Sequence, residues 1–166
     1  MKCRKNAPRR PNFDYCSAHW YFITMVTADR RPWLARVSPG RYELTPAGRI
    51  AWEVWLDRPG WFPGVQLDAF VVMPDHFHAI VALPGGGVSL SRLVGTFKVA
   101  TTRAVRGIVG PGRLWQRSFW DRIVRNETDL RRFRNYVRNN PRRAMASVRV
   151  PAGWDRCDGR GSRNAE

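Results

Sequence analysis

The longest apolar run in the sequence, within residues 69–83, limits the possible folds more than any other feature. It is broken by a proline, an aspartate and two histidines, so it is too short and too polar to cross a membrane. Strand-like stretches at residues 66–72 and 76–83 flank Pro74 and Asp75, which are typical turn residues. We therefore expect an antiparallel hairpin in the middle of the chain, and no membrane partner.

The preceding and following segments alternate between strand and helix signals. Residues 20–27 are rich in β-branched and aromatic side chains and predict a strand. Thr45, followed by a proline, is a typical helix start, and Pro59 stops that helix. Ser89 is expected to cap a further helix, whose apolar residues recur at helical spacing: Leu90, Leu93, Val94, Phe97, Ala100, Ala104, Val105 and Ile108.

A fourth strand and a last helix complete the pattern. Residues 114–124 predict the strand, with apolar residues among alternating polar ones. The helix begins near Asn126 or Thr128 and is expected to end at Asn140, because Pro141 limits it. The order βαββαβ predicts an α+β, ferredoxin-like antiparallel sheet with two helices on one face, followed by a C-terminal helix that carries a tyrosine.

The domain organisation follows from length and composition. The 166 residues fit one domain, which we place at residues 19–145. Residues 1–18 are predicted to be a basic arm and residues 146–166 a mobile tail rich in arginine and glycine. Three cysteines without a CxxC spacing argue against a disulfide framework and indicate a reducing cytoplasm.

The charge of the chain indicates its partner. Twenty-nine Lys and Arg against 13 Asp and Glu give a net charge of +16, which attracts polyanions. Nearly all of these cations are arginines, whose guanidinium groups suit phosphate oxygens. Eight tryptophans and eight phenylalanines offer stacking surfaces for unpaired bases, although core packing accounts for most aromatic residues. We expect a nucleic-acid partner and a cytoplasmic, nucleoid-associated protein.

Two of the three histidines, His76 and His78, lie on one predicted strand. Side chains at positions i and i+2 point to the same face of a strand, so both imidazoles can converge on one divalent ion. Mg²⁺ or Mn²⁺ would keep open positions there for waters and phosphate oxygens. The alternative is that both are partly exposed strand residues without a ligand. Asp75, directly before the pair, is interpreted as a turn residue.

The last predicted helix carries a tyrosine at the edge of its apolar stripe. Leu130, Phe133 and Val137 form the stripe, Tyr136 lies beside it, and Asn140 follows one turn later. A phenol and an amide oxygen can therefore face a shared ion and phosphate. Six surrounding arginines suit a nucleic-acid backbone: Arg131, Arg132, Arg134, Arg138, Arg142 and Arg143. The alternative is a tyrosine packed into the core beneath solvated arginines.

Three segments resemble a known family. Residues 71–81 resemble the HUH motif (histidine, hydrophobic residue, histidine) of Y1 transposases. Residues 114–122 and 133–141 resemble the closing part of the REP-associated tyrosine transposases, which are related to the IS200/IS605 group. The resemblance covers about residues 19–143.

The resemblance implies a metal-dependent enzyme that cleaves and rejoins single-stranded DNA next to hairpins through a covalent 5′-phosphotyrosine. Carried over to this chain, it makes His76 and His78 ligands of Mg²⁺ or Mn²⁺ and Tyr136 the nucleophile. Asn140 stands where relatives often have glutamine as a third ligand, and its shorter side chain requires a closer helix or a bridging water. The oligomeric state is expected to be a monomer or a homodimer.

Five basic residues are predicted to contact DNA: Lys98, Arg103, Arg117, Arg132 and Arg138. For Lys98 and Arg103 the alternative is a solvated helix face, and for the nearby Trp115 the alternative to a DNA contact is core packing.

Two further functions stay open. One is a non-catalytic basic module that holds hairpin DNA or RNA without cutting it. The other is a two-histidine phosphoesterase acting on RNA ends, which would need two separate His-x-Ser/Thr motifs, whereas His78 is followed by Ala79 and Ile80.

Overall fold

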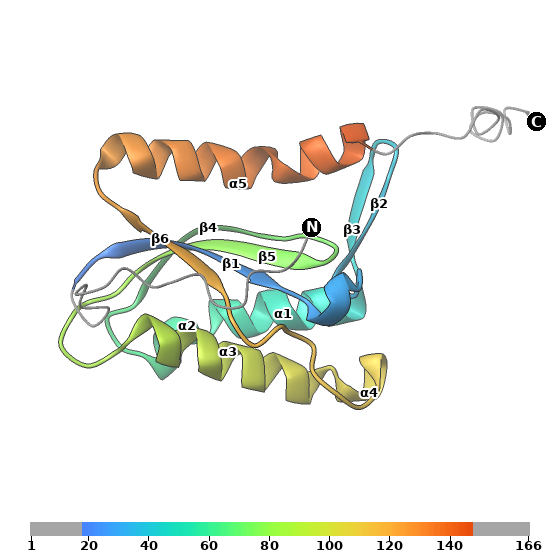
Figure 1. Cartoon of the computed structure of the whole chain (residues 1–166), viewed down its shortest axis with the longest axis horizontal. Helices are drawn as coiled ribbons and strands as arrows, with labels where there is room; N and C mark the ends of the chain where they lie inside the picture. Colours follow the sequence, from blue (N-terminus) through green and yellow to red (C-terminus); the bar gives the residue numbers. More distant parts are fainter. Residues whose placement is uncertain (1–17, 148–166) are drawn as a thin grey trace, which may run out of the picture.

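A four-stranded antiparallel sheet forms the centre of the molecule (Figure 1). In the computed structural model, which describes residues 18–147, the strand order is β4-β5-β1-β6. The strands are β1 (Trp20–Val26), β4 (Gln66–Val72), β5 (His76–Ala82) and β6 (Trp120–Val124). This order and the alternation of strands with helices confirm the predicted α+β, ferredoxin-like fold.

Two long helices cover one face of the sheet, as predicted. These are α1 (Pro46–Leu56) and α3 (Leu90–Ala104), each followed by a one-turn helix, α2 (Arg58–Trp61) and α4 (Arg106–Val109). The Thr45 hydroxyl accepts a hydrogen bond from Gly48 N at 3.1 Å and thereby caps α1. Of the predicted stripe, Leu90, Leu93, Val94, Phe97 and Val105 are buried and Ala100 is half-buried, whereas Ala104 is exposed and Ile108, which lies in α4, is 47% exposed.

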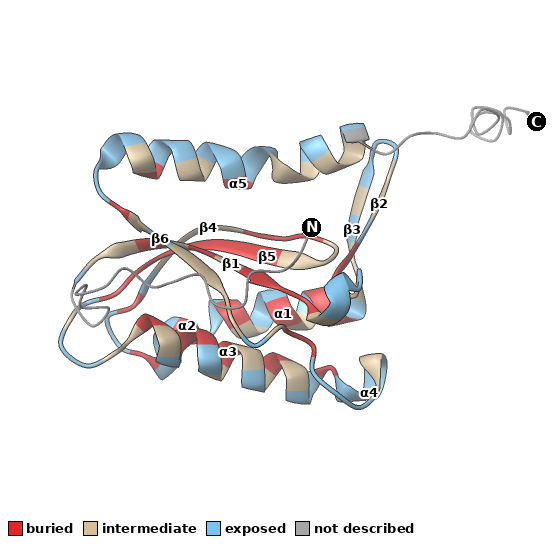
Figure 2. Ribbon diagram, viewed as in Figure 1, coloured by how far each residue is buried: buried red, intermediate tan, exposed pale blue. Residues whose placement is uncertain are grey.

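The C-terminal helix, α5 (Glu127–Ser147), covers the opposite face of the sheet (Figure 1). Its inner side is partly buried and its outer side exposed (Figure 2). The prediction that it ends at Asn140 is wrong, because Pro141 lies inside the helix. Ala144, beyond the proline, packs against an apolar cluster on the sheet, and this packing favours continuation despite the lost backbone hydrogen bond.

A second, two-stranded sheet was not predicted. Strands β2 (Ala35–Ser38) and β3 (Arg41–Leu44) form a hairpin that reaches the C-terminal half of α5 (Figure 1). The Tyr42 hydroxyl donates a hydrogen bond to the carbonyl oxygen of Val72 at the end of β4, and burial raises the pKa of Tyr42 to about 12. Four-residue strands give too few alternating positions to be predicted from the sequence.

The segment around Leu34 joins the helical layer to the turn before β5. Leu34 N donates to Pro74 O at 3.0 Å, and Leu34 O accepts from Thr45 N at 3.0 Å. A Cβ at Gly48 would overlap the Leu34 carbonyl oxygen, so only glycine lets α1 approach this closely.

The predicted fourth strand is shorter than residues 114–124, because regular pairing begins at Trp120. Trp115 makes one isolated bridge, with Thr27, and is 2% exposed. Its indole Nε1 donates to the Thr101 hydroxyl on α3 at 2.7 Å, so Trp115 is part of the core beneath the helices.

The predicted boundaries at residues 18 and 146 fall at the limits of the described chain. The α5 helix continues to Ser147, past the boundary at residue 145, and the remainder of the predicted arm and tail lies outside the described residues. Within residues 18–147, no helix has the length and apolar composition needed to span a membrane.

Candidate active site

The histidine pair lies on the face of the sheet that α5 covers. His76 and His78 share this face of β5, while the intervening Phe77 packs into the core on the α1 and α3 side. The two imidazole centroids are 4.7 Å apart, with their planes at 71°. The strand therefore brings both rings together as the sequence predicts.

His78 is buried, at 5% exposure, and is held by the neighbouring strand. Its Nδ1 lies 2.8 Å from the hydroxyl oxygen of Thr24, the residue paired with it on β1. Among residues 18–147, its buried Nε2 has no hydrogen-bond partner. Burial, and secondarily the charge of His76, lowers the pKa of His78 to about 3, so the ring is neutral at physiological pH. A neutral imidazole with an unpaired nitrogen is the form that binds a metal.

His76 is oriented by an acidic neighbour. Its Nδ1 lies 2.6 Å from Asp75 Oδ1, and Arg30 Nη1 is 3.1 Å from the other carboxylate oxygen. Although burial opposes it, these bonds to His76 and Arg30 lower the pKa of Asp75 below its usual range. A carboxylate on Nδ1 leaves Nε2 for a ligand, the arrangement typical of metal-binding histidines.

Tyr136 lies against one of the two histidines, His78. Its ring centroid is 5.1 Å from that of His78, at an interplanar angle of 74°, and its edge contacts Phe22 of β1 at 5.8 Å. Phe133, one turn earlier, stacks on Phe22 at 4.6 Å and so fixes the position of the helix. Tyr136 is 39% exposed, which leaves the phenol accessible and excludes a fully core-packed role.

Asn140 is half-buried one turn beyond Tyr136 on α5. The unpartnered Nε2 of His78 is a suitable ligand atom for a divalent ion. Between residues 18 and 147 there is no cluster of three or more His, Cys, Asp or Glu able to hold a metal. A divalent ion on the two imidazoles would therefore need further oxygen ligands, such as the amide oxygen of Asn140, waters or substrate phosphate.

An ion pair attaches α5 to the edge strand. Arg134 donates from Nε to Asp68 Oδ2 at 2.8 Å, and its Nη2 lies 2.7 Å from the same oxygen. Asp68 lies at the irregularity in the β4–β5 pairing and also accepts from Ala69 N at 2.7 Å. Arg134 is thus occupied by the protein, unlike the exposed arginines on the same helix.

The predicted DNA contacts fall on both sides of the sheet. Arg132 and Arg138 are exposed on α5, near the site, and Arg117 is exposed in the segment before β6. Arg103 is exposed on α3, which lies on the opposite face from Tyr136. The structure therefore brings only Arg132 and Arg138 onto the same helix as the phenol.

Lys98 also lies on α3. It is not on a solvated helix face, which was the alternative to a DNA contact. It is half-buried, and Nζ donates to the carbonyl oxygens of Gln116 at 2.9 Å and Ser118 at 2.8 Å. Burial lowers the pKa of Lys98 to about 8. In this position Nζ connects α3 to the segment that leads into β6.

Sequence analysis did not identify the groups that orient the imidazoles. Thr24 lies 54 residues before His78 and can be found only from the strand register. Asp75 is adjacent to His76 in sequence, but a turn aspartate carries no signal of its bond to the ring. Arg30 belongs to a short 3-10 segment with positive φ angles, which no pattern predicted.

Comparison with known proteins places this fold in a class. A family model described as "Transposase IS200 like" matches residues 63–140, from β4 through the tyrosine helix. A putative transposase from Deinococcus radiodurans has the same fold, with a TM-score of 0.52 and 19% identity over 79% of this chain and 97% of that one.

Closer relatives define the family. A REP-associated tyrosine transposase of Escherichia coli is 30% identical over 84% of this chain and 72% of its own length. An uncharacterized protein of Haemophilus influenzae is 27% identical over 80% of this chain and 86% of its own length. A REP-associated tyrosine transposase solved in complex with a REP hairpin superposes with a TM-score of 0.66 and 27% identity, over 84% of this chain and 74% of that one. The chain belongs to the REP-associated tyrosine transposases.

Proposed function

We propose that the protein cleaves single-stranded DNA beside a hairpin and rejoins it, as an endonuclease and strand transferase with Tyr136 as the nucleophile. The observation that carries this proposal is the contact between the accessible Tyr136 ring and His78, 5.1 Å between centroids. The similar transposase bound to a REP hairpin supports hairpin DNA as the substrate. The charge of +16 favours any such polyanion.

The covalent step is a transesterification. The phenolic oxygen of Tyr136 attacks the phosphorus, and the bond from phosphorus to the 3′-oxygen breaks. The phenol loses its proton and the departing 3′-oxygen gains one, so a free 3′-hydroxyl and a 5′-phosphotyrosine result. Attack of another 3′-hydroxyl on this linkage joins the strands and regenerates the phenol, without an external energy source.

The residues around the phenol position the scissile phosphate. His76, His78 and Asn140 would hold Mg²⁺ or Mn²⁺, which when bound polarises a phosphate oxygen. Thr24 and Asp75 orient the imidazoles by contacting Nδ1 of His78 and His76, respectively. The Nε2 atom of each ring is then left for the metal. Arg132 and Arg138 contact the DNA backbone from the exposed side of α5.

A covalent adduct tests the proposal. The protein is mixed with a labelled hairpin oligonucleotide that carries single-stranded flanks, with Mg²⁺, Mn²⁺ or EDTA, and run on a denaturing gel. We expect labelled protein in either metal, no label in EDTA and none with Tyr136→Phe, because the phenolic oxygen forms the bond. An adduct that persists in Tyr136→Phe would assign the nucleophile to another residue.

His76→Ala separates chemistry from binding in the same experiment. We expect this variant to keep hairpin binding but to lose the adduct by at least about 100-fold, because one metal ligand is gone. Equal loss of binding and adduct would show that the histidine is structural. Binding without any adduct, across several hairpins and both metals, would support the non-catalytic binding module instead.

A further inference from the structure

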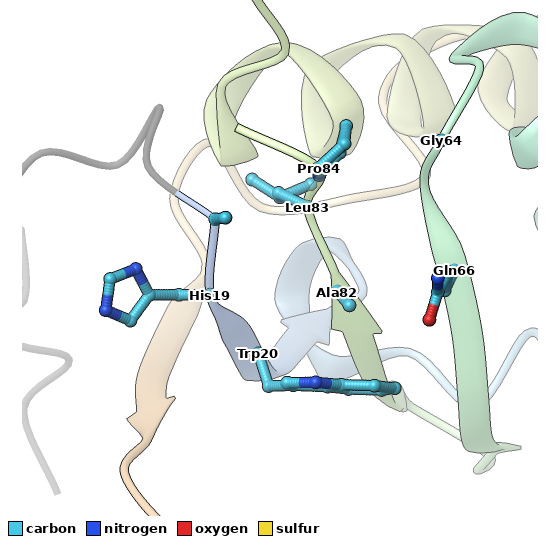
Figure 3. A pocket seen from close by; sticks show the side chains of 8 residues that line it. His19, Trp20, Gly64, Gln66, Ala82, Leu83 and Pro84 are labelled. Carbon is cyan, nitrogen blue, oxygen red and sulfur yellow. The ribbon is translucent and has the colours of Figure 1, made fainter. Parts of the chain in front are cut away.

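We propose that a pocket at the far end of the same sheet face binds one unpaired DNA base, stacked on the indole of Trp20 and read by the amide of Gln66. The pocket measures about 460 Å³ and is lined by eight residues from the ends of β1, β4 and β5 (Figure 3). The assignment of a DNA base to this pocket rests on the function proposed above, because a single-stranded DNA substrate supplies the unpaired base.

Strand register builds the floor of the pocket. Trp20 on β1 and Gln66 on β4 are both paired with Ala82 of β5, so all three side chains lie in one row on one face. Because Ala82 is small, the indole can lie flat across β5 toward Gln66 (Figure 3). Gln66 is exposed, so its amide is available to a ligand.

The chemistry of the lining suits a base better than a phosphate. An indole face stacks any base, and such stacking is sequence-tolerant. A glutamine amide offers both donors and an acceptor, which can pair with the edge of a base and distinguish one base from another. The lining carries no Lys or Arg, and the imidazole of His19 points away from the other side chains (Figure 3).

The pocket lies on the same sheet face as the tyrosine. Trp20 and Thr24 share one face of β1, four residues apart, which is about 13 Å at the usual strand rise. Thr24 contacts His78, beneath Tyr136. The straight-line separation corresponds to about four stacked nucleotides at about 3.4 Å each, and a strand that passes around α5 needs more, because Phe133 of α5 stacks on Phe22 between the two points.

Abasic scanning tests this assignment. Hairpin oligonucleotides with one abasic position at a time in the single-stranded flank are titrated against protein carrying Tyr136→Phe, which prevents cleavage, and binding is followed by fluorescence anisotropy. One abasic position is expected to weaken binding by about 5- to 100-fold, the range typical of base–aromatic stacking. In Trp20→Leu the penalty at that position should disappear, while the penalties elsewhere stay unchanged. Trp61→Leu is the matched control, since Trp61 is 58% exposed on α2, across the sheet.

Gln66→Ala is the second variant, and it does not depend on the packing of the indole. At the same nucleotide position, we expect the wild-type protein to prefer one base over the others by about tenfold. Gln66→Ala should abolish this preference and leave the loss of affinity at the abasic position in place. Uniform weakening at every position in both variants, or the same pattern in Trp61→Leu, would overturn the base pocket. A position-specific effect supports it even if no adduct ever forms with Tyr136 intact, an outcome that would overturn the proposed function alone.

Discussion

At the scale of single residues, the hydroxyl of Thr24 determines which nitrogen of His78 is available. Because Thr24 Oγ1 contacts Nδ1 at 2.8 Å in a buried position, the tautomer with Nδ1–H donating to the hydroxyl leaves a lone pair on Nε2. The sequence predicts that His76 and His78 share a face, since this follows from strand periodicity alone. It does not predict their hydrogen-bond partners, which depend on how β1 and β5 align.

Replacing Thr24 tests this role. In Thr24→Val the shape is kept but Nδ1–H loses its acceptor, so the imidazole can turn or change tautomer. We expect the adduct rate at limiting Mn²⁺ to fall by about 10- to 100-fold, and the imidazole nitrogen NMR signals of His78 to change in the metal-free protein. Thr24→Ser should retain both properties.

Thr96→Val is the matched control, because the Thr96 hydroxyl donates to helix carbonyls of α3, on the other face of the sheet. An unchanged imidazole spectrum in Thr24→Val would refute the orienting role.

At the scale of elements, the position of α5 brings the phenol to the histidines. The stripe of Leu130, Phe133 and Val137 predicts a helix with Tyr136 at the edge of its buried side, and the structure agrees. The stripe cannot tell which face of the sheet the helix covers, because both faces carry apolar residues. Nor does the sequence show that packing beyond Pro141 lengthens the helix to Ser147.

The Asp68–Arg134 pair should hold α5 in register on the sheet. In Asp68→Asn the carboxylate that accepts both Arg134 nitrogens becomes a neutral amide, and the attachment of the helix to β4 weakens. We expect faster hydrogen exchange at the amides of α5, unchanged exchange in β1 and β5, and a several-fold lower adduct rate with little change in hairpin affinity.

Arg131→Ala provides the comparison for this pair, because Arg131 is exposed on the same helix. If the α5 amides exchange hydrogen at the same rates in Asp68→Asn and in Arg131→Ala, the ion pair does not position the helix.

At the scale of the whole molecule, the sheet separates two regions with different tasks. The main core lies between the sheet and the α1–α3 layer, and the candidate site lies between the sheet and α5. The βαββαβ order was sufficient to predict the first region, because regular periodicity determines it. The hairpin β2–β3 and the position of α5 depend on long-range packing, for which a single sequence carries no periodic signal.

The charge on Lys98 should make the stability of the whole fold depend on pH. Its pKa is about 8 in the folded state and 10.5 when unperturbed, so between these values the unfolded chain binds more protons. The free energy of unfolding attributable to Lys98 therefore rises with pH across this window, by on the order of 3 kcal/mol. Urea unfolding at pH 7 to 10.5 should show this rise for the wild type relative to Lys98→Met.

The comparison with Lys98→Met isolates the group, because other residues that titrate in this range, such as Tyr42, contribute equally to both proteins. Parallel pH dependences of the two proteins would show that the ammonium group carries no burial penalty.

The closeness of α1 to Leu34 has a consequence for sequence change far from the chemistry. A single residue, Leu34, accepts from Thr45 N at the start of α1 through its carbonyl and donates to the carbonyl of Pro74, two residues before His76, through its N–H. A larger residue at Gly48 would displace that carbonyl. Because Leu34 also bonds to Pro74, the displacement would shift the turn that precedes His76. Variation in the outer helical layer is therefore restricted at Gly48 by the geometry that the imidazoles require, although no atom of this glycine comes near the substrate face.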